Sequence, residues 1–321
     1  MTMDPPPSTG QWYARFSAQA AEGSLAYARL ADAVAGSASL LRLLDTLPEQ
    51  KRQPNLLFAA ARLLGAPVED PPGFVAWVPE HWAPLAALMQ RRRTQTNEPR
   101  RSATLLPLLA SLPGPLALLE VGASAGLCLY PDRWRYRYGD HPLGDASRPL
   151  LTCAPIGEFA PPAHVPDVVW RAGIDLNPLD VTDPDDVAWL EALVWPGQPD
   201  RLERLQQAIA IARADPPPIT AGDLNIELPA LAAQAPADAT LVVFHSAVLT
   251  YLDRPDRTRF VEQVTALPGH WISNEGPEVL PDIGARVPAG REDTRHRFLT
   301  ALDGVPFAWS GGHGQTIELL R

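Results

Sequence analysis

Apolar residues recur every three or four positions through most of the first third of the chain, which is typical of amphipathic helices. Helical segments of this kind are predicted over 25–47, 55–64, 79–93 and 101–112. The second of these ends at Gly65 with Pro67 beyond it, a normal helix stop signal. We find no convincing strand pattern before Pro115. The pattern therefore predicts an N-terminal all-α domain over residues 1–112.

The pattern changes after the turn at residues 113–115, where short and continuously apolar runs begin to alternate with helical segments. Such runs are typical of buried parallel strands. Strands are predicted over 116–121, 167–176, 217–224, 241–244 and 269–276. The segment 305–319 is predicted as a terminal hairpin with its turn at 311–314. Strands separated by helices indicate a doubly wound α/β sheet, which we assign to residues 113–321.

An insertion near 130–165 separates the first two predicted strands. Within it Trp134, Tyr136 and Tyr138 alternate with arginines, which is strand periodicity. One interpretation is a cationic, aromatic surface that binds a ligand. The other, which we favour, is a half-buried hairpin whose arginines face water.

Composition narrows the classes of function. The chain is 46% hydrophobic with a net charge of −10, so it can bury a core, and its charge opposes a general nucleic-acid role. The two cysteines and the scattered histidines lack metal-ligand spacing, so no metal site is predicted. Prolines interrupt the most apolar stretch, 105–121, and the N-terminus lacks a signal-peptide pattern. We expect a cytoplasmic protein that does not enter membranes.

The stretch LLEVGASAGL, residues 118–127, carries two competing motifs. Gly122, Ser124 and Gly126 form G-x-S-x-G, the pattern of a hydrolase nucleophile elbow. His313 lies near the C-terminus, and Asp282 or Asp303 supplies the order Ser…Asp…His, so a serine esterase is one alternative. However, the helical region upstream holds no glycine-rich oxyanion loop and none of the strands that normally precede such an elbow.

The second motif is E-x-G-x-x-x-G, formed by Glu120, Gly122 and Gly126, and we favour it. A loop after the first strand of a doubly wound sheet lies at the strand's carboxyl end, where ligands bind. We expect the glycines to let the backbone approach a ligand. We also expect a helix from about Ala125 to direct free N–H groups at a carboxylate, and Glu120 to take an ammonium group. S-adenosylmethionine carries both charges. Ser124 breaks the dinucleotide pattern G-x-G-x-x-G, which disfavours a nicotinamide cofactor.

Five segments together resemble a known family. They are QTNEPRRSATLLPLLA, LLEVGASAGLCLYPDRWRYRYG, AGIDLNPLDVTDPDD, FHSAVLTYL and GGHGQTIEL. In this order they resemble the bacterial domain-of-unknown-function family 2332 over nearly the whole chain. The family is uncharacterised, and its C-terminal half is similar to Rossmann-like (class I) S-adenosylmethionine-dependent methyltransferases.

The resemblance implies roles for individual residues. Glu120, Gly122 and Gly126 match the first methyltransferase motif, with Ser124 in place of its middle glycine. Asp175 matches the acid that binds the ribose hydroxyls, although it follows Glu120 at an unusually long interval. The acid near the adenine amine is matched by Asp223, which would complete the cofactor contacts.

Further candidates follow the predicted strands. His245 comes after the clearest strand and is a candidate general base, since histidine titrates near neutral pH. Tyr251 is a candidate for the same pocket, and Ser246 and Asn177 are candidate cofactor contacts. Strand capping, helix packing and turn chemistry explain such residues equally well.

The polar segment 95–101 is either a solvated linker or a cover over the pocket, with Arg100 or Arg101 meeting an anionic substrate.

We therefore expect a methyltransferase that uses S-adenosylmethionine on a small-molecule substrate of unknown identity. A non-catalytic protein that binds S-adenosylmethionine or a nucleoside is the first alternative, and the serine esterase is the second. Product formation from the cofactor distinguishes the first two.

Overall fold

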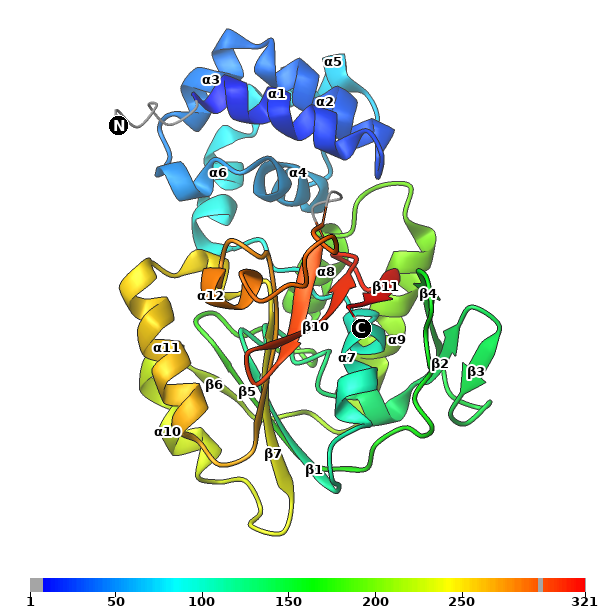
Figure 1. The fold of residues 1–321 in the computed structure, drawn as a ribbon. Coiled ribbons are helices and arrows are strands. Elements are labelled where there is room, and N and C mark those ends of the chain that lie inside the picture. Colours follow the sequence, from blue (N-terminus) through cyan, green and yellow to red (C-terminus); the bar gives the residue numbers. More distant parts are fainter. Residues whose placement is uncertain (1–7, 294–296, 321) are drawn as a thin grey trace. The chain divides into compact units, whose positions relative to one another are not determined.

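The computed structural model describes residues 8–293 and 297–320, which form two compact units (Figure 1). The first unit extends to Thr96 and also includes Thr182–Glu203. The second unit comprises Asn97–Val181 and the chain from Arg204 onward. The boundary thus falls between residues 96 and 97, whereas the sequence predicts it between 112 and 113. The later segment Thr182–Glu203, here called the excursion, also belongs to the first unit.

The first unit is helical, as its periodicity predicts. Its helices are α1 (Thr9–Ala20), α2 (Leu25–Ala35), α3 (Ala38–Leu44), α4 (Pro54–Leu63), α5 (Pro71–Glu80), α6 (Trp82–Arg91) and α8 (Pro184–Ala192), with the short 3-10 helix η1 (Glu49–Lys51). Serine side chains cap the first three: Ser8, Ser24 and Ser37 each accept a backbone N–H from the first turn.

Aromatic side chains fill the core of this unit. Phe58 packs against the rings of Tyr13, Tyr27 and Phe74 at centroid distances of 4.9–6.1 Å. Trp195, from the excursion, lies 5.8 Å from Tyr27. Aromatic pairs of this kind contribute about 0.5–1.5 kcal/mol beyond their buried area. The excursion is therefore part of the core of the first unit.

The second unit contains one sheet and the remaining helices. These are α7 (Arg101–Leu109), the later part of α9 (Pro199–Ala214), α10 (Leu224–Ala232), α11 (Arg254–Ala266) and α12 (Pro281–Gly284), with 3-10 helices η2 (Pro131–Arg133) and η3 (Leu249–Tyr251). Figure 1 shows α10 and α11 on one side of the sheet and α7 on the other.

The sheet has eleven strands among the described residues. They are β1 (Leu116–Val121), β2 (Arg135–Tyr138), β3 (His141–Leu143), β4 (Leu150–Pro155), β5 (Val168–Asp175), β6 (Ile219–Ala221), β7 (Thr240–Ser246), β8 (His270–Glu275), β9 (Phe298–Leu302), β10 (Val305–Ser310) and β11 (Thr316–Leu319). The order is β3-β2-β4-β11-β10-β9-β8-β7-β1-β5-β6. From β6 to β8 all neighbours are parallel, whereas β8, β9, β10 and β11 are successively antiparallel. This is a mixed α/β fold.

Each predicted strand and the terminal hairpin are present. The insertion is also a hairpin as favoured: Trp134, Tyr136 and Tyr138 are at most 1% exposed, while Arg133 and Arg137 face water. Two strands, β4 and β9, are missing from the prediction. The strand β4 pairs in parallel with the nearby β2 and with the distant β11. The strand β9 forms antiparallel pairs with β8 and β10.

One core holds the parallel strands in place. Leu119 and Val121 of β1 pack in a cluster with Leu228 of α10 and Phe260 of α11. Each such side chain stabilises the fold by about 1.5–3 kcal/mol relative to an exposed position. This packing fixes the carboxyl ends of β1, β5 and β7, where the candidate site lies.

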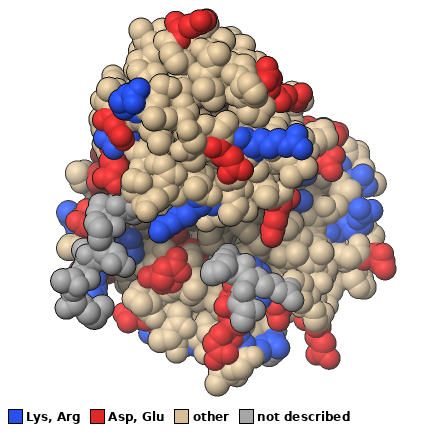
Figure 2. Space-filling model, turned by 90° about the horizontal axis from the view of Figure 1, so that it is seen from above, with Lys and Arg blue, Asp and Glu red and all other residues tan. Residues whose placement is uncertain are grey.

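Charges of both signs mix on the surface seen in Figure 2, where basic side chains are scattered among acidic ones. Among the described residues, no helix is both long enough and apolar enough to cross a bilayer.

Candidate functional site

The carboxyl ends of the parallel strands bring most of the predicted site residues to one edge of the sheet. Glu120 in β1 is in register with Gly173 of β5 and Phe244 of β7. Asp175 ends β5 opposite Ala221 of β6. The carboxyl edge of parallel strands is where α/β proteins bind ligands. The candidate site is therefore built around the loop that follows β1.

This loop, residues 122–126, uses its own amides internally. The N–H groups of Gly122 and Ala123 donate to the Ile174 carbonyl at 2.8 and 3.0 Å. The next three amides donate to the Asp175 carboxylate, the Asn97 side-chain oxygen and the Ala123 carbonyl. The expectation that free loop amides receive a ligand carboxylate is therefore wrong.

The helix expected from about Ala125 is also absent, because residues 122–130 form turns. Ser124 and Gly126 have φ of 52° and 68°, and Gly122 has φ of 70°. A right-handed helix requires φ near −63°. The second glycine and the strained serine reverse the chain instead of starting a helix, so no helix begins in this loop.

The two glycines are required by packing within the protein. A Cβ at Gly122 would lie 2.7 Å from Val248 Cγ1. One at Gly126 would lie 2.8 Å from Pro217 Cγ. The positive φ at both positions further disfavours other residues. The space that the motif was expected to leave for a ligand backbone contact is filled by these side chains.

Glu120 is the buried acid of the site. It is 7% exposed, and within the described residues its Oε2 is buried without a hydrogen-bond partner. Burial raises the pKa of Glu120 well above its ordinary value; the positive charge of Arg101 opposes this shift and the negative charge of Asp175 adds to it. A buried carboxyl oxygen without a partner is costly, so a ligand donor here would be stabilising.

Arg101, on α7, brings a positive charge to the same region. Its Nε donates to the Gly312 carbonyl at 3.0 Å and its Nη1 to the Ser246 carbonyl at 3.1 Å. Its guanidinium also lies 5.7 Å from the Phe298 ring centroid. Across residues 8–293 and 297–320, no ion pair joins Arg101 to Glu120, although their charges interact. The guanidinium of Arg101 thus lies near the buried Glu120 carboxyl without an ion-pair contact to it.

Asn97 fixes the polar segment 95–101 to the loop. Its side-chain nitrogen donates to Ser124 Oγ at 2.9 Å, and its oxygen accepts from Ala125 N at 3.3 Å. Its neighbour Glu98 is fully buried and forms a two-point ion pair with Arg204. The segment is thus anchored at the candidate site instead of being a solvated linker.

Asp175 organises two turns. Its Oδ2 accepts the Ser124 N–H at 2.8 Å and its Oδ1 accepts the Asn177 N–H at 2.7 Å. Asp223 is exposed and caps α10 by accepting the Asn225 N–H at 2.8 Å. Both acids lie near the carboxyl ends of their strands, as the motif match requires, and both have structural roles there.

His245 is wholly buried and both ring nitrogens have protein partners. Its Nδ1 lies 2.8 Å from Glu275 Oε1, and its Nε2 accepts the Trp271 indole N–H at 3.0 Å. Since indole only donates, Nε2 carries no proton and Nδ1 is the donor to Glu275. No ring nitrogen remains to accept a substrate proton, so the structure contradicts the predicted general-base role.

Tyr251 and Ser246 also differ from their expected roles. Tyr251 is 77% exposed on η3 and does not line a buried pocket. Ser246 Oγ accepts the side-chain N–H of Asn274 at 2.6 Å and belongs to a polar layer across β7 and β8. Neither residue is positioned for chemistry by its neighbours.

A serine-hydrolase arrangement is not assembled. Ser124 Oγ accepts from the Asn97 side-chain amide, and Asp303 accepts from His270 Nδ1 at 2.7 Å. No histidine hydrogen-bonds Ser124 in the part of the chain that the structure describes.

Sequence reasoning missed the residues that shape the loop from a distance. Glu275 accepts the N–H groups of Val248 and Leu249 at 2.8 and 3.0 Å, and so holds Val248 over Gly122. The available signal was the polar run Ser273–Glu275 in the second half of β8, which is unusual for buried positions.

The second unit is thus an α/β domain with a charged site at the carboxyl edge of its parallel strands. The family model described as "Uncharacterized protein conserved in bacteria" (DUF2332) matches residues 11–317. The chain belongs to this family, as its five segments predict. No curated protein matches the chain by sequence.

Proposed function

We propose that the second unit binds S-adenosylmethionine at the carboxyl ends of β1, β5 and β6, and that the protein is a small-molecule methyltransferase. The order of the parallel strands supports this. Numbered along the chain, β1, β5, β6, β7 and β8 lie in the sheet as 3-2-1-4-5. This is the order of nucleotide-binding doubly wound sheets, whose ligands bind where the order reverses. Here the reversal lies at β1.

The observation that carries the proposal is the buried and unpartnered Oε2 of Glu120. An ammonium group satisfies such an oxygen and favours the ionised carboxylate. Arg101 supplies the opposite charge nearby without pairing to Glu120. The two side chains suit an α-amino-acid group, with its ammonium at Glu120 and its carboxylate at Arg101. Arg101 takes the role predicted for loop amides and a helix N-terminus, and Glu120 keeps its predicted role.

The acids Glu120, Asp175 and Asp223 fit the cofactor. Gly122 and Gly126 do not, because protein side chains fill the space beside them. The resemblance assigns Asp175 to the ribose and Asp223 to the adenine. S-adenosylmethionine supplies an electrophilic methyl group when bound, and the chain's own residues bind and orient it.

A non-catalytic binding protein is the second candidate, and the engagement of both His245 nitrogens favours it. We assign no catalytic base. Conversion of S-adenosylmethionine to S-adenosylhomocysteine in the presence of a mixture of bacterial small molecules distinguishes an enzyme from a binder.

Calorimetric titration tests the assigned orientation. S-adenosylhomocysteine carries the amino-acid group and 5′-methylthioadenosine lacks it. We expect the former to bind at least about tenfold more tightly, since charged hydrogen bonds contribute about 1.5–3 kcal/mol. Glu120→Gln should remove most of this preference, while Glu262→Gln, an exposed control on α11, should keep it. Equal binding of both ligands contradicts the orientation, and binding of neither contradicts the proposed function.

A further inference from the structure

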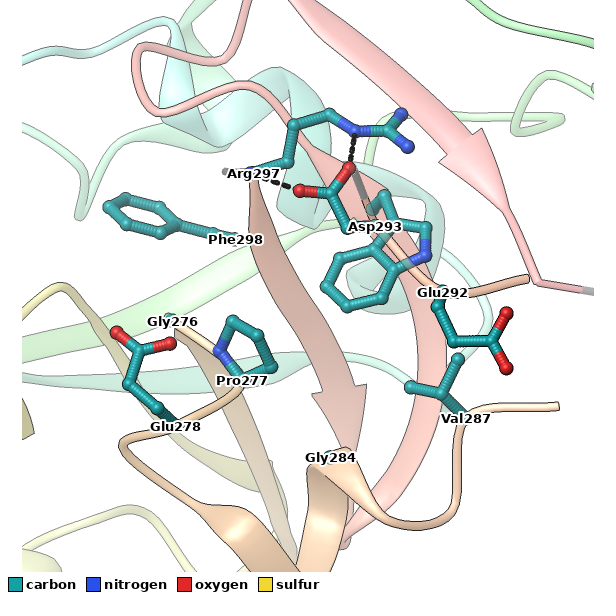
Figure 3. A pocket seen from close by; sticks show the side chains of 10 residues that line it. Gly276, Pro277, Glu278, Gly284, Val287, Glu292, Asp293, Arg297 and Phe298 are labelled. Carbon is teal, nitrogen blue, oxygen red and sulfur yellow. Dashed lines mark hydrogen bonds and ion pairs between the residues drawn. The ribbon is translucent and has the colours of Figure 1, made fainter. Parts of the chain in front are cut away.

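A cavity of about 320 Å³ lies at the carboxyl end of β8, outside the loop after β1 (Figure 3). Its volume is at the lower end of the range for small-molecule pockets, 300–1,000 Å³. Its walls come from the segment after β8, the end of α12, the start of β9 and the end of β10.

One part of the lining is apolar and aromatic. Pro277, Val287, Phe298 and Trp309 contribute it, and Trp309 is held because its indole N–H donates to the Arg291 carbonyl at 2.7 Å. Aromatic faces of this kind attract organic cations as well as apolar groups.

The charged part of the lining is predominantly acidic. Arg297 donates from Nε to Asp293 at 2.7 Å and from Nη1 to Glu318 at 2.7 Å, so its positive charge is already matched. Glu278 and Glu292 remain as carboxylates beside the cavity. Figure 3 shows these two on opposite sides of it. Backbone N–H groups lower the pKa of Glu292, which is therefore ionised at neutral pH.

We infer that this cavity binds a small organic cation: an amine with an aromatic or aliphatic body, held by Glu278 and Glu292 and packed on the Phe298 and Trp309 rings. An anion would meet uncompensated carboxylates here. The apolar and aromatic walls suit the organic body of such a cation. The inference does not depend on the cofactor proposed at β1.

Three probes that share a phenylethyl body and differ in charge test it: phenethylammonium, 2-phenylethanol and 3-phenylpropionate. Titrations followed by ligand-observed NMR should show phenethylammonium binding most tightly and 3-phenylpropionate most weakly. The double variant Glu278→Gln/Glu292→Gln should lower phenethylammonium affinity about tenfold and leave 2-phenylethanol nearly unchanged.

Glu158→Gln/Glu262→Gln is the matched control, because it removes two exposed carboxylates of the same unit outside the cavity. We expect this control to bind phenethylammonium with the wild-type affinity. Equal affinity for the cation and the alcohol in the wild-type protein overturns the inference. So does an equal loss in both double variants, or the absence of phenethylammonium binding at millimolar concentration.

Discussion

At the scale of single residues, Glu120 links stability to the proposed binding. Burial raises its pKa, so the folded protein holds a proton that the unfolded chain releases at a lower pH. The contribution of the protonated Glu120 to the free energy of unfolding is fully present below the ordinary pKa of glutamate. It is lost as pH rises through the raised pKa of the folded state. A bound ammonium group would reverse this preference, so ligand binding should release a proton.

We therefore expect Glu120→Gln to be more stable than the wild-type protein at neutral pH and to lose less stability as pH rises above about 4.5. Urea unfolding at a series of pH values measures this directly. Exposed Glu262→Gln serves as the control and should keep the wild-type slope. An unchanged slope in Glu120→Gln would mean that another group carries the dependence.

Gly122 offers a second residue-scale prediction, with a matched control. Gly157 has φ of 72°, close to the 70° of Gly122, but nothing lies within 4 Å of its Cβ position. Gly157→Ala should cost only backbone strain, about 1 kcal/mol. Gly122→Ala should cost about 1–3 kcal/mol more, because its Cβ meets Val248.

Chemical denaturation of Gly122→Ala, Gly157→Ala and Gly122→Ala/Val248→Ala separates strain from packing. The double variant should recover part of the packing loss, since the two changes share one contact. Equal costs for the two glycines would show that Val248 does not constrain the loop.

At the scale of elements, Asp175 connects β5 to the loop after β1, whereas Asp223 acts within one helix end. Asp175→Ala should cost about 1–3 kcal/mol, since two partly buried N–H groups lose their acceptor. Asp223→Ala should cost about 0.5–2 kcal/mol, as other N-caps do.

Amide hydrogen exchange distinguishes the two acids by location. We expect faster exchange at Ser124 and Asn177 in Asp175→Ala, and only near Asn225 in Asp223→Ala. If the Ser124 amide keeps its protection in Asp175→Ala, the carboxylate does not hold the loop.

The sequence predicts elements well where burial is continuous. The apolar run Leu116–Val121 corresponds residue for residue to β1, and the aromatic alternation at 134–138 identifies the hairpin. The strand β9 was missed because the Asp303-Gly304 turn, which joins β9 to β10 in a local hairpin, was not recognised in the sequence. The loop was mispredicted because a glycine motif does not reveal whether a ligand or Val248 fills the space beside it.

At the scale of the whole molecule, periodicity distinguishes a helical part of the chain from an α/β part, but it does not locate the boundary between the two units. The excursion Thr182–Glu203 belongs to the first unit through Trp195 and through Trp189, whose indole donates to the Arg93 carbonyl. Such contacts join residues about a hundred positions or more apart, and a local pattern carries no information on them. For the site, Glu120 and Asp175 lie at the sheet edge that the sequence predicts, whereas the contacts of His245 and of the glycines contradict their predicted roles.

The central claim is that the second unit binds S-adenosylmethionine or its demethylated product. Thermal unfolding of the full chain with S-adenosylhomocysteine tests it most directly. At 100 times its Kd, a ligand specific for the folded state adds about 2.7 kcal/mol, which corresponds to a rise of about 5 °C in Tm for a protein of this size. We predict this rise in the wild-type protein and a smaller one in Glu120→Gln. An unchanged wild-type Tm at millimolar S-adenosylmethionine and S-adenosylhomocysteine would contradict the account.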